Sequence, residues 1–291
     1  HGTWNTYIRD NSEYYDAVIL HSYSSVSMNM TTTSDLMESF SESCALEETA
    51  LDLYREEFKG KDFWFTEYGD LPGFLLDGPN TSLKSRLQYM KSVGNAVGYV
   101  QKLLTLLQNN EVTMAAHHAF CDSQGFGIIE TDKSKLPNFY VYEKIGDIFN
   151  KYSHLYSLTQ KSVESDEFLY SKDRTYAKLN IQRLSSWAFG DEHGAKEAVF
   201  VNTSPYPVNV SVPSKFLKKK WHYGASSYGG NNPLPDFAVD SVYWTESPNN
   251  IPLVDEYDGG FYDTLEVPAY SVVAADIGDA GMQLRYSDVS Y

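Results

Sequence analysis

The fold of this chain is decided by the stretch KDFWFTEYGD, residues 61–70. Its continuous apolar run, Phe63 to Phe65, is typical of a short strand that is covered on both faces. Glu67 follows where burial should end, and Gly69 is a turn signal. A carboxylate at the carboxyl end of a parallel strand stands where barrel enzymes hold their catalytic groups, although an acidic residue at a strand end can also be merely solvated.

Two further strands of the same kind flank this stretch. Residues 16–23 (DAVILHSY) form an apolar strand that ends in His21 and Tyr23, whose side chains point the same way because strand side chains alternate. Residues 112–120 (VTMAAHHAF) form another, which ends near His117 and His118. By the same alternation these two histidines face opposite sides, so one of them points away from any site at this edge.

Helical periodicity separates these strands. Apolar residues recur at helical spacing over 44–58, 82–109 and 139–152, whereas the Ser-, Thr- and Met-rich segment 24–43 predicts a long loop. Strands that alternate with helices indicate a parallel sheet with right-handed crossovers, so the three strand ends share one edge. After about residue 158, short strands with turn signals replace this pattern and predict an antiparallel β-sandwich.

Composition narrows the class of partner. The 291 residues carry a formal net charge of −16, which argues against binding to nucleic acid or to an anionic membrane. No apolar run is long enough to span a bilayer. The 23 Tyr, 15 Phe and 5 Trp can line a sugar-binding cleft or fill a core. A zinc site built from the histidines is a weak alternative because no His-Glu-x-x-His spacing occurs, and no cofactor or metal is predicted.

Four sequons predict N-glycosylation, and they begin at Asn29, Asn80, Asn202 and Asn209. They favour a secreted glycoprotein, in an extracellular or lysosome-like compartment. Because the chain starts at His1 and has no visible signal peptide, we expect a processed or incomplete product.

The chain contains two cysteines, Cys44 and Cys121. An even count in a secreted chain permits one disulfide, while two buried thiols or a bond to another chain are the alternatives.

In order and spacing, these features resemble the C-terminal half of a retaining glycoside hydrolase of clan A, a (β/α)8 TIM barrel with an attached β-sandwich, as in the heparanase-like, arabinofuranosidase-like and xylosidase-like families. Thr66-Glu67-Tyr68-Gly69 matches the end of that group's seventh strand, and His21-Ser22-Tyr23 matches a His-x-Tyr motif at the end of the sixth. Residues 136–140, 199–204 and 265–273 resemble its last barrel helix entry and two sandwich strands. The resemblance implies barrel strands six to eight over 1–157, a sandwich over 158–279 and a tail over 280–291.

The resemblance also implies roles for individual residues. Glu67 takes the place of the nucleophile of retaining hydrolysis, which needs two carboxyl groups about 5–5.5 Å apart. His21 and Tyr23 would contact the nucleophile or the sugar. Tyr68, His118 and Phe120 are candidates for sugar contacts, although each can also be structural. A Cys44–Cys121 disulfide would bridge the loops after strands six and eight.

Two departures from the pattern matter. Many clan members have a Trp at the end of the eighth strand, where this chain has His117 and His118. The resemblance therefore does not define the platform on which a sugar would stack, nor the class of substrate. The general acid/base, a Glu that follows an Asn at the end of strand four, would precede His1, and Asn110-Glu111 stands before a strand instead. We therefore expect an N-terminal segment or chain that completes the barrel around a carbohydrate substrate.

A different class of function is the alternative, namely a non-catalytic, glycosidase-derived extracellular glycoprotein that binds glycan or builds an assembly. A hydrolase with a Ser nucleophile is disfavoured because no Gly-x-Ser-x-Gly elbow occurs.

Overall fold

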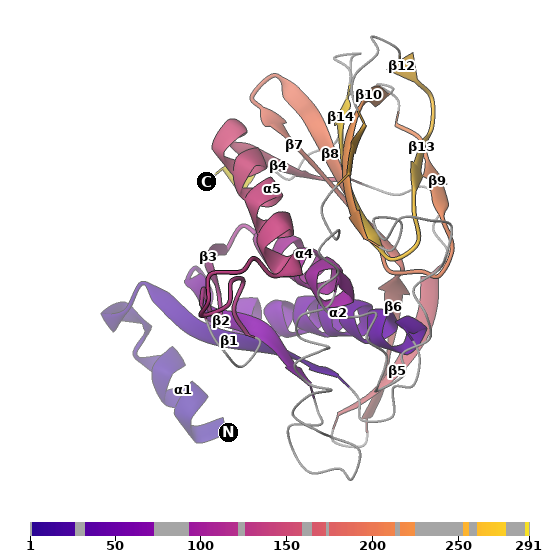
Figure 1. Ribbon diagram of the computed structural model, residues 1–291. Helices are drawn as coiled ribbons and strands as arrows, with labels where there is room; N and C mark the ends of the chain where they lie inside the picture. Colours follow the sequence, from indigo (N-terminus) through magenta and orange to yellow (C-terminus); the bar gives the residue numbers. More distant parts are fainter. Residues whose placement is uncertain are drawn as a thin grey trace.

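A computed structural model of the chain describes residues 2–26, 33–72, 93–121, 126–158, 165–172, 175–212, 216–224, 253–255, 261–277 and 289–290. Its first half alternates strands and helices (Figure 1). The elements in chain order are α1 (Gly2–Asp10), a short 3-10 turn (Ser12–Tyr14), β1 (Ala17–Val26), α2 (Thr33–Glu57), β2 (Asp62–Pro72), α4 (Val93–Leu107), β3 (Val112–His117) and α5 (Pro137–Lys151).

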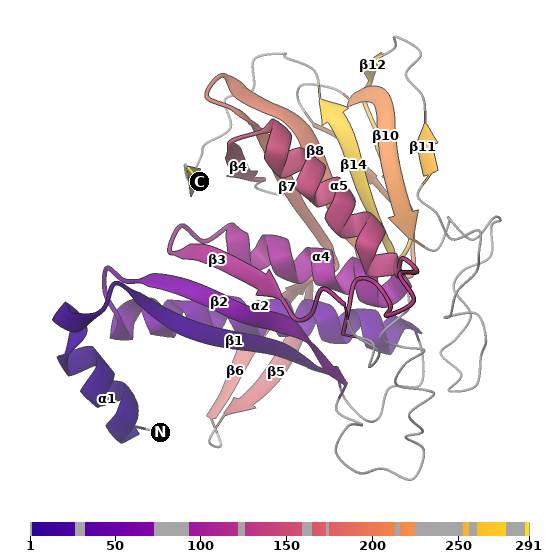
Figure 2. The same ribbon diagram turned by 60° about the vertical axis from the view of Figure 1, so that its left-hand side comes forward.

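The three strands form a parallel sheet in the order β1-β2-β3. Helices α2 and α4 lie along one face of this sheet, as the turned view shows (Figure 2). Phe63 and Phe65 point into that covered face and are buried. Three large apolar side chains on the other face are exposed in the described structure: Ile19 by 61%, Trp64 by 41% and Met114 by 43%. The apolar run of β2 is therefore covered on one face only by the described residues.

Helix α2 corrects the prediction of a loop over residues 24–43. It begins at Thr33 rather than at residue 44. Its added turns bury Met37 and Phe40 in the core. The ring of Phe40 lies where a side chain on Gly98 of α4 would overlap it, so the two helices approach closely at that glycine. Burial against α4 stabilises a helix whose Ser- and Thr-rich sequence has modest helical propensity of its own.

Helix α4 is the central element of the molecule (Figures 1 and 2). Residues 93–106 are all buried because α4 lies between the parallel sheet and the antiparallel strands that follow. The sequence predicted an amphipathic helix over 82–109, and residues 82–92 of it lie outside the described residues. A helix buried all round is hydrophobic on more than one face, as α4 is.

The second half is antiparallel. Its elements are β4 (His154–Ser157), β5 (Ser165–Lys172), β6 (Thr175–Gln182), β7 (Leu184–Asp191), β8 (Gly194–Asn202), β9 (Val208–Val210), β10 (Phe216–Gly224), β11 (Leu253–Asp255), β12 (Phe261–Tyr262), β13 (Leu265–Val267), β14 (Ser271–Ile277) and β15 (Val289–Ser290). One eight-stranded sheet has the order β11-β10-β14-β8-β7-β4-β15, with β12 on β10, and two strand pairs, β9–β13 and β5–β6, stand apart from it.

Alternation along β8 explains how this sheet is covered. Val199 and Val201 belong to the core shared with α4 and α5, whereas Ala198 and Phe200 belong to a second core, against which β9 and β13 pack. In the described residues the layer on that side is this strand pair and not a second large sheet. Within 280–291, expected as a tail, Val289 and Ser290 pair with β4.

The two halves share one core. Polar contacts also cross between them: the hydroxyls of Ser41 and Thr203 lie 2.8 Å apart, and Gln101 donates to Ser185 at 3.1 Å. Lys144 of α5 pairs with the buried Glu197 of β8 at 2.6 Å. Since the expected boundary near residue 157 runs through this core, neither half can be removed without exposing buried apolar surface.

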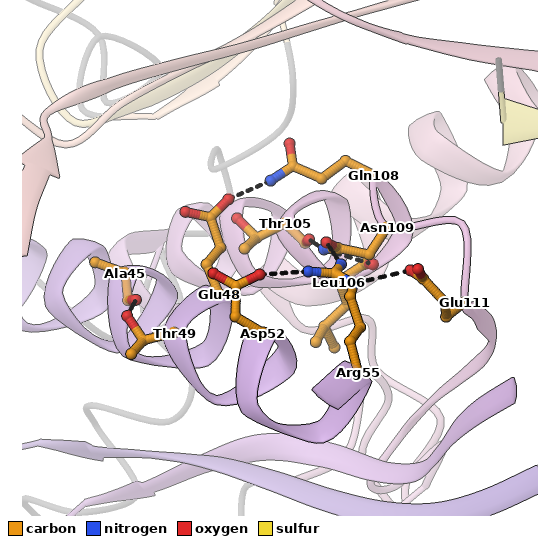
Figure 3. Close-up of polar contacts among 10 residues, drawn as sticks. All are labelled: Ala45, Glu48, Thr49, Asp52, Arg55, Thr105, Leu106, Gln108, Asn109 and Glu111. Atoms are coloured by element: carbon orange, nitrogen blue, oxygen red, sulfur yellow. Dashed lines mark hydrogen bonds and ion pairs between the residues drawn. The ribbon is translucent and has the colours of Figure 1, made fainter. Parts of the chain in front are cut away.

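A polar cluster lies between α2 and the end of α4, beside the turn that leads into the amino end of β3 (Figure 3). Arg55 of α2 pairs with Asp52 at 2.6 Å and with Glu111, just before β3, at 3.1 Å, and it also donates to Asn109. These contacts join α2 to the turn between α4 and β3. In sheets of this kind the amino ends of the strands serve stability, whereas chemistry is found at the carboxyl ends.

Candidate active site

A β-bulge determines the face of the sheet to which the Glu67 side chain points. On β1 the pairs run Leu20↔Phe65 and then His21↔Glu67, so β2 carries Thr66 as an extra residue, and the register with β3 also shifts here. In an unbroken strand Glu67 would share the buried face of Phe63 and Phe65. The extra residue turns Glu67 to the open face, in agreement with the use of bulges beside active sites to redirect a side chain.

Glu67 has two polar partners on β1. The hydroxyl of Tyr23 donates to its Oε2 at 2.6 Å, and His21 Nδ1 lies 3.5 Å from the same oxygen. His21 Nε2 is also 3.0 Å from the hydroxyl of Thr66. The hydrogen bond from Tyr23 lowers the pKa of Glu67, partial burial opposes this, and His21 and His118 add smaller favourable effects. The carboxyl group is thus held in its ionised form.

Tyr23 is fixed in its donor role. Partial burial, and then the bond to Glu67, raise the pKa of its hydroxyl well above the ordinary value, so the hydroxyl keeps its proton. Gly69, directly across the ladder from Tyr23, allows this placement. A Cβ at position 69 would lie 3.2 Å from the Tyr23 ring, closer than side chains normally pack.

His118 stands on the far side of Glu67, just after β3. Its backbone N–H donates to the carbonyl oxygen of Tyr68 at 3.0 Å, which extends the ladder by one residue. Its ring lies edge-on to Tyr23 with the centroids 6.3 Å apart, and it is exposed. Phe120, two residues on, is 65% exposed. A sugar contact by either residue stays a prediction.

The position of Tyr68 in the structure corrects its expected contact with a sugar. The sequence placed it among the sugar-contacting residues, but it is 1% exposed and faces the helices. It follows Glu67 on the strand, and alternation sends neighbouring side chains to opposite faces. Its hydroxyl lies 2.7 Å from that of Tyr142 on α5, and its ring packs against Tyr99 and His117. Tyr68 is a core residue beneath the site.

The predicted disulfide is also wrong. Cys44 and Cys121 are both free thiols. Cys44 lies in the middle of α2 and is buried, and burial raises the pKa of its thiol to about 12. Cys121 lies in the loop after β3, where it is exposed. The expected pairing assumed that Cys44 belonged to a loop beside the site, and the earlier start of α2 removes that premise.

The structure bears differently on the four predicted N-glycosylation sites. Asn202 is 0% exposed, and its Nδ2 donates to the carbonyls of Tyr206 at 2.8 Å, Pro268 at 3.0 Å and Val267 at 3.1 Å. A glycan on this nitrogen is incompatible with the fold, so the prediction at this position is wrong. Asn209 on β9 is exposed, and glycosylation there stays a prediction. Asn29 and Asn80 lie outside the described residues.

Within the described ranges, no group of three His, Cys, Asp or Glu side chains is arranged to hold a metal ion. None of the helices in the same part of the chain combines the length and the apolar character needed to cross a membrane.

Sequence reasoning missed the bulge at Thr66 and the partners of Tyr68 on α4 and α5. One signal for the bulge is present in the sequence: Glu67 has the same strand parity as the buried aromatics Phe63 and Phe65. A charged residue at a strand position whose side chain would point to the buried face indicates that the alternation is broken before that residue.

Comparison with known proteins gives no match to any protein-family model and none to a curated protein sequence. Solved structures do match. A family 51 α-L-arabinofuranosidase from Bifidobacterium longum aligns with 95% of this chain and 56% of its own, at 16% identity and a TM-score of 0.62. The arabinose complex of an α-L-arabinofuranosidase from Thermotoga maritima aligns with 94% of this chain and 55% of its own, at 14% identity and a TM-score of 0.58.

A third similar structure is a 4-O-α-L-rhamnosyl-β-D-glucuronidase from Fusarium oxysporum, which aligns with 91% of this chain and 54% of its own, at 11% identity and a TM-score of 0.52. The chain thus spans a little over half the length of these structures. The resemblance in fold to clan A glycoside hydrolases, suggested by the sequence, is confirmed.

Proposed function

We propose that this chain is the C-terminal part of a retaining O-glycosidase, with Glu67 as the nucleophile. The observation that carries the proposal is the 2.6 Å hydrogen bond from Tyr23 to a carboxylate that a bulge turns to the open face at the carboxyl ends of parallel strands. The glycosidase folds of the similar structures support it, as does the lowered pKa of Glu67, because a nucleophile must be ionised to attack.

The proposed reaction has two steps. Glu67 attacks the anomeric carbon while the bond from that carbon to the leaving oxygen breaks, and the leaving oxygen takes a proton from the general acid. Water then attacks the covalent glycosyl-enzyme, gives its proton to the same residue, now a base, and releases Glu67 as a carboxylate. Tyr23 keeps its proton throughout and holds the attacking carboxylate in place.

The general acid/base is proposed to lie outside this chain. In the described part of the chain, the residues that act on the charge of Glu67 are Tyr23, His21 and His118, and none of them is a carboxylic acid. The proposal follows the clan A resemblance, in which the acid would stand at the end of an earlier barrel strand.

We propose that five further strands complete the barrel, supplied by a preceding segment or by a separate chain. Ile19, Trp64 and Met114 are register neighbours across β1, β2 and β3, and they form an exposed apolar row on the open face. Open sheet edges and an exposed apolar face are features that folded proteins cover. A closed barrel would bury this row directly below Glu67.

The proposed substrate is an O-glycosidic bond of a polysaccharide or glycoconjugate, and an extracellular or lysosome-like location is proposed with it. The similar structures are enzymes of arabinofuranosides and of a rhamnosyl-glucuronide, which supports a carbohydrate but not one sugar. The exposed sequon at Asn209 is consistent with the location.

The second candidate is a non-catalytic glycan-binding or structural glycoprotein. The observation that favours it is that the side chains that shift the pKa of Glu67 in the described residues, Tyr23, His21 and His118, include no acid.

A mechanism-based label separates the two candidates. Native material, with any co-purifying segment, is treated with a panel of 2-deoxy-2-fluoro glycosyl fluorides, which trap the nucleophile and need little acid assistance. Peptide mass spectrometry should place the sugar on Glu67. Glu67→Gln should take up no label, and Glu143→Gln, the same change at an exposed carboxylate of α5, should label like the native protein. Glycan binding without any label on Glu67 would favour the non-catalytic protein.

A further inference from the structure

A largely buried cluster of four rings lies under the candidate site, on the helix side of the sheet: Tyr68 and Tyr99 are fully buried, and His117 and Tyr142 are partly buried. His117 of β3 stands at its centre, with ring centroids 4.7 Å from Tyr99, 5.0 Å from Tyr142 and 5.6 Å from Tyr68. The proposed reaction uses none of these side chains directly. Polar groups buried in such surroundings are costly unless each is paired, so their hydrogen bonds define the arrangement.

The hydrogen bonds of His117 are fixed by one carbonyl. Its Nε2 lies 2.8 Å from the carbonyl oxygen of Phe126, which can only accept, so Nε2 carries the proton. Burial lowers the pKa of His117 to about 4, so the ring is neutral and Nδ1 is an acceptor. The hydroxyl of Tyr142, 2.9 Å from Nδ1, therefore donates to it, and Tyr68 in turn donates to Tyr142 at 2.7 Å.

This chain of hydrogen bonds, from Tyr68 through Tyr142 and His117, holds the loop after β3 at Phe126. The carbonyl of Phe126 accepts a second bond, from the backbone N–H of Ala119 at 3.1 Å, so one oxygen ties both His117 and Ala119 to the returning loop. The ring of Phe126 packs against His118 with the centroids 5.7 Å apart. The position of His118 thus depends on Phe126, and the position of Phe126 depends on His117.

Sequence adjacency links the buried cluster to the site. Tyr68 follows Glu67, and His117 precedes His118, so in each pair one side chain faces the site and the other faces the helices. The two inward members are joined through one hydroxyl, that of Tyr142 on α5. Helix α5 thereby couples the backbone of β2 to that of β3 at the point where the two site residues emerge.

We propose that His117 and Tyr142 are positioning residues that set the placement of His118 relative to Glu67. The role in catalysis rests on the proposed function, whereas the geometric role does not. The groups that face His117 from the packed elements are Tyr68, Tyr99, Tyr142 and His118. Burial raises the pKa of Tyr68 and Tyr142 and lowers that of His117 to about 4, so these three hydrogen-bonded side chains stay neutral near pH 7.

The test compares removal of one hydroxyl at two places. Tyr142→Phe deletes the donor to His117, and Tyr54→Phe deletes a tyrosine hydroxyl of α2 outside the cluster. Trapping of Glu67 by the fluoro sugar is measured as a maximal rate and a half-saturating concentration. We expect Tyr142→Phe to lower the maximal rate about ten- to hundredfold, the size of effect that small misplacements produce, with half-saturation little changed. Tyr54→Phe should behave as the native protein.

Substitutions of His117 distinguish its hydrogen bond to the Phe126 carbonyl from its hydrogen bond with Tyr142. His117→Gln keeps an N–H that can reach the Phe126 carbonyl, whereas His117→Leu keeps no polar atom. The glutamine variant should therefore recover part of the rate that the leucine variant loses. A loss of equal size in both, or a Tyr142→Phe rate equal to that of Tyr54→Phe, would overturn the proposal.

A second readout works without activity. The ring nitrogens of His118 and His117 are followed by long-range ¹⁵N–¹H NMR, and hydrogen exchange is followed for the amides of residues 118–121. Tyr142→Phe should move the His118 signals and speed exchange of Ala119, while circular dichroism stays native. If native protein is never labelled, the proposed function fails and these signals still decide the geometric role: unmoved His118 signals overturn it.

Discussion

The hydroxyl of Tyr23 donates a 2.6 Å hydrogen bond to Oε2 of Glu67, across two neighbouring strands and 44 positions of sequence. Both partners are placed by features of β2: the extra residue Thr66 turns Glu67 to the open face, and Gly69 leaves room for the Tyr23 ring. The pair therefore depends on backbone register as much as on the two side chains. Its main chemical effect is to keep the carboxylate ionised.

Replacing Tyr23 by Phe should therefore change the pH dependence of nucleophile trapping. The pKa of Glu67 is lowered chiefly by this hydrogen bond, so its loss raises that pKa toward the ordinary value. The acid limb of the plot of trapping rate against pH should move to higher pH in Tyr23→Phe. Tyr14→Phe, at an exposed tyrosine remote from the site, is the control. An acid limb that stays in place in both variants would show that another group governs it.

The buried amide of Asn202 makes a strong prediction about stability. Asn202→Asp replaces an amide nitrogen, whose two N–H groups reach three carbonyl oxygens, by an oxygen that faces the same three carbonyls. The carbonyls of Tyr206 and Pro268 keep a second donor, from Ser204 and Ser271, so the carbonyl of Val267 and the new oxygen are the groups left unpaired. Each unpaired buried group costs about 1–3 kcal/mol, so we expect urea denaturation to give a loss of at least about 2 kcal/mol. Asn209→Asp, the same change at an exposed sequon, should shift stability by less than about 0.5 kcal/mol. Equal losses at the two positions would contradict the burial of Asn202.

The sequence predicted the parallel strands well because each is a short apolar run of strand-favouring residues. The expected ranges 61–70 and 112–120 differ from β2 and β3 by a few residues at the ends. The first half of α2 was missed for a physical reason: its residues are polar in composition, and the burial that stabilises it comes from α4, far along the chain.

The site was predicted in part. Glu67, His21 and Tyr23 are brought together as expected, since strand ends share an edge. The errors at Tyr68, Asn202 and the cysteines have a common cause, because each prediction rested on a local pattern while burial is set by distant segments. The His117–Tyr142–Tyr68 chain joins three elements, and no pattern in the sequence indicates it.

Thiol chemistry should distinguish the two cysteines. Cys44 is buried with a pKa near 12, and Cys121 is exposed, so the native chain should consume about one equivalent of a thiol reagent quickly. The second equivalent should react only after unfolding, and peptide mapping should place the first on Cys121. Cys121→Ser should abolish the fast phase. No reaction before reduction would instead indicate a disulfide.

Two helical glycines offer a matched pair for helix packing. A methyl at Gly98 of α4 would overlap the buried ring of Phe40, whereas Gly146 of α5 has no atom within 4 Å of the same position. Overpacking a core costs about 1–3 kcal/mol, so Gly98→Ala should lower the thermal midpoint. Gly146→Ala should raise stability by about 0.5–1 kcal/mol through helix propensity. Two stabilised variants would mean that α2 and α4 do not approach at Gly98.

Lowering the pH from about 6.5 to about 4 should destabilise the chain through His117. The unfolded imidazole binds a proton below about pH 6.5, whereas the folded one, buried among tyrosines, stays neutral down to about pH 4. Between these values the unfolded state holds more protons, so the free energy of unfolding falls as the pH falls. The full loss from this one residue is about 3 kcal/mol, and it is absent above pH 6.5. Urea denaturation from pH 4 to 8 measures it as the difference between native protein and His117→Gln. The two curves should run parallel above pH 6.5 and converge below it, and parallel curves throughout would show that His117 is not buried in its neutral form.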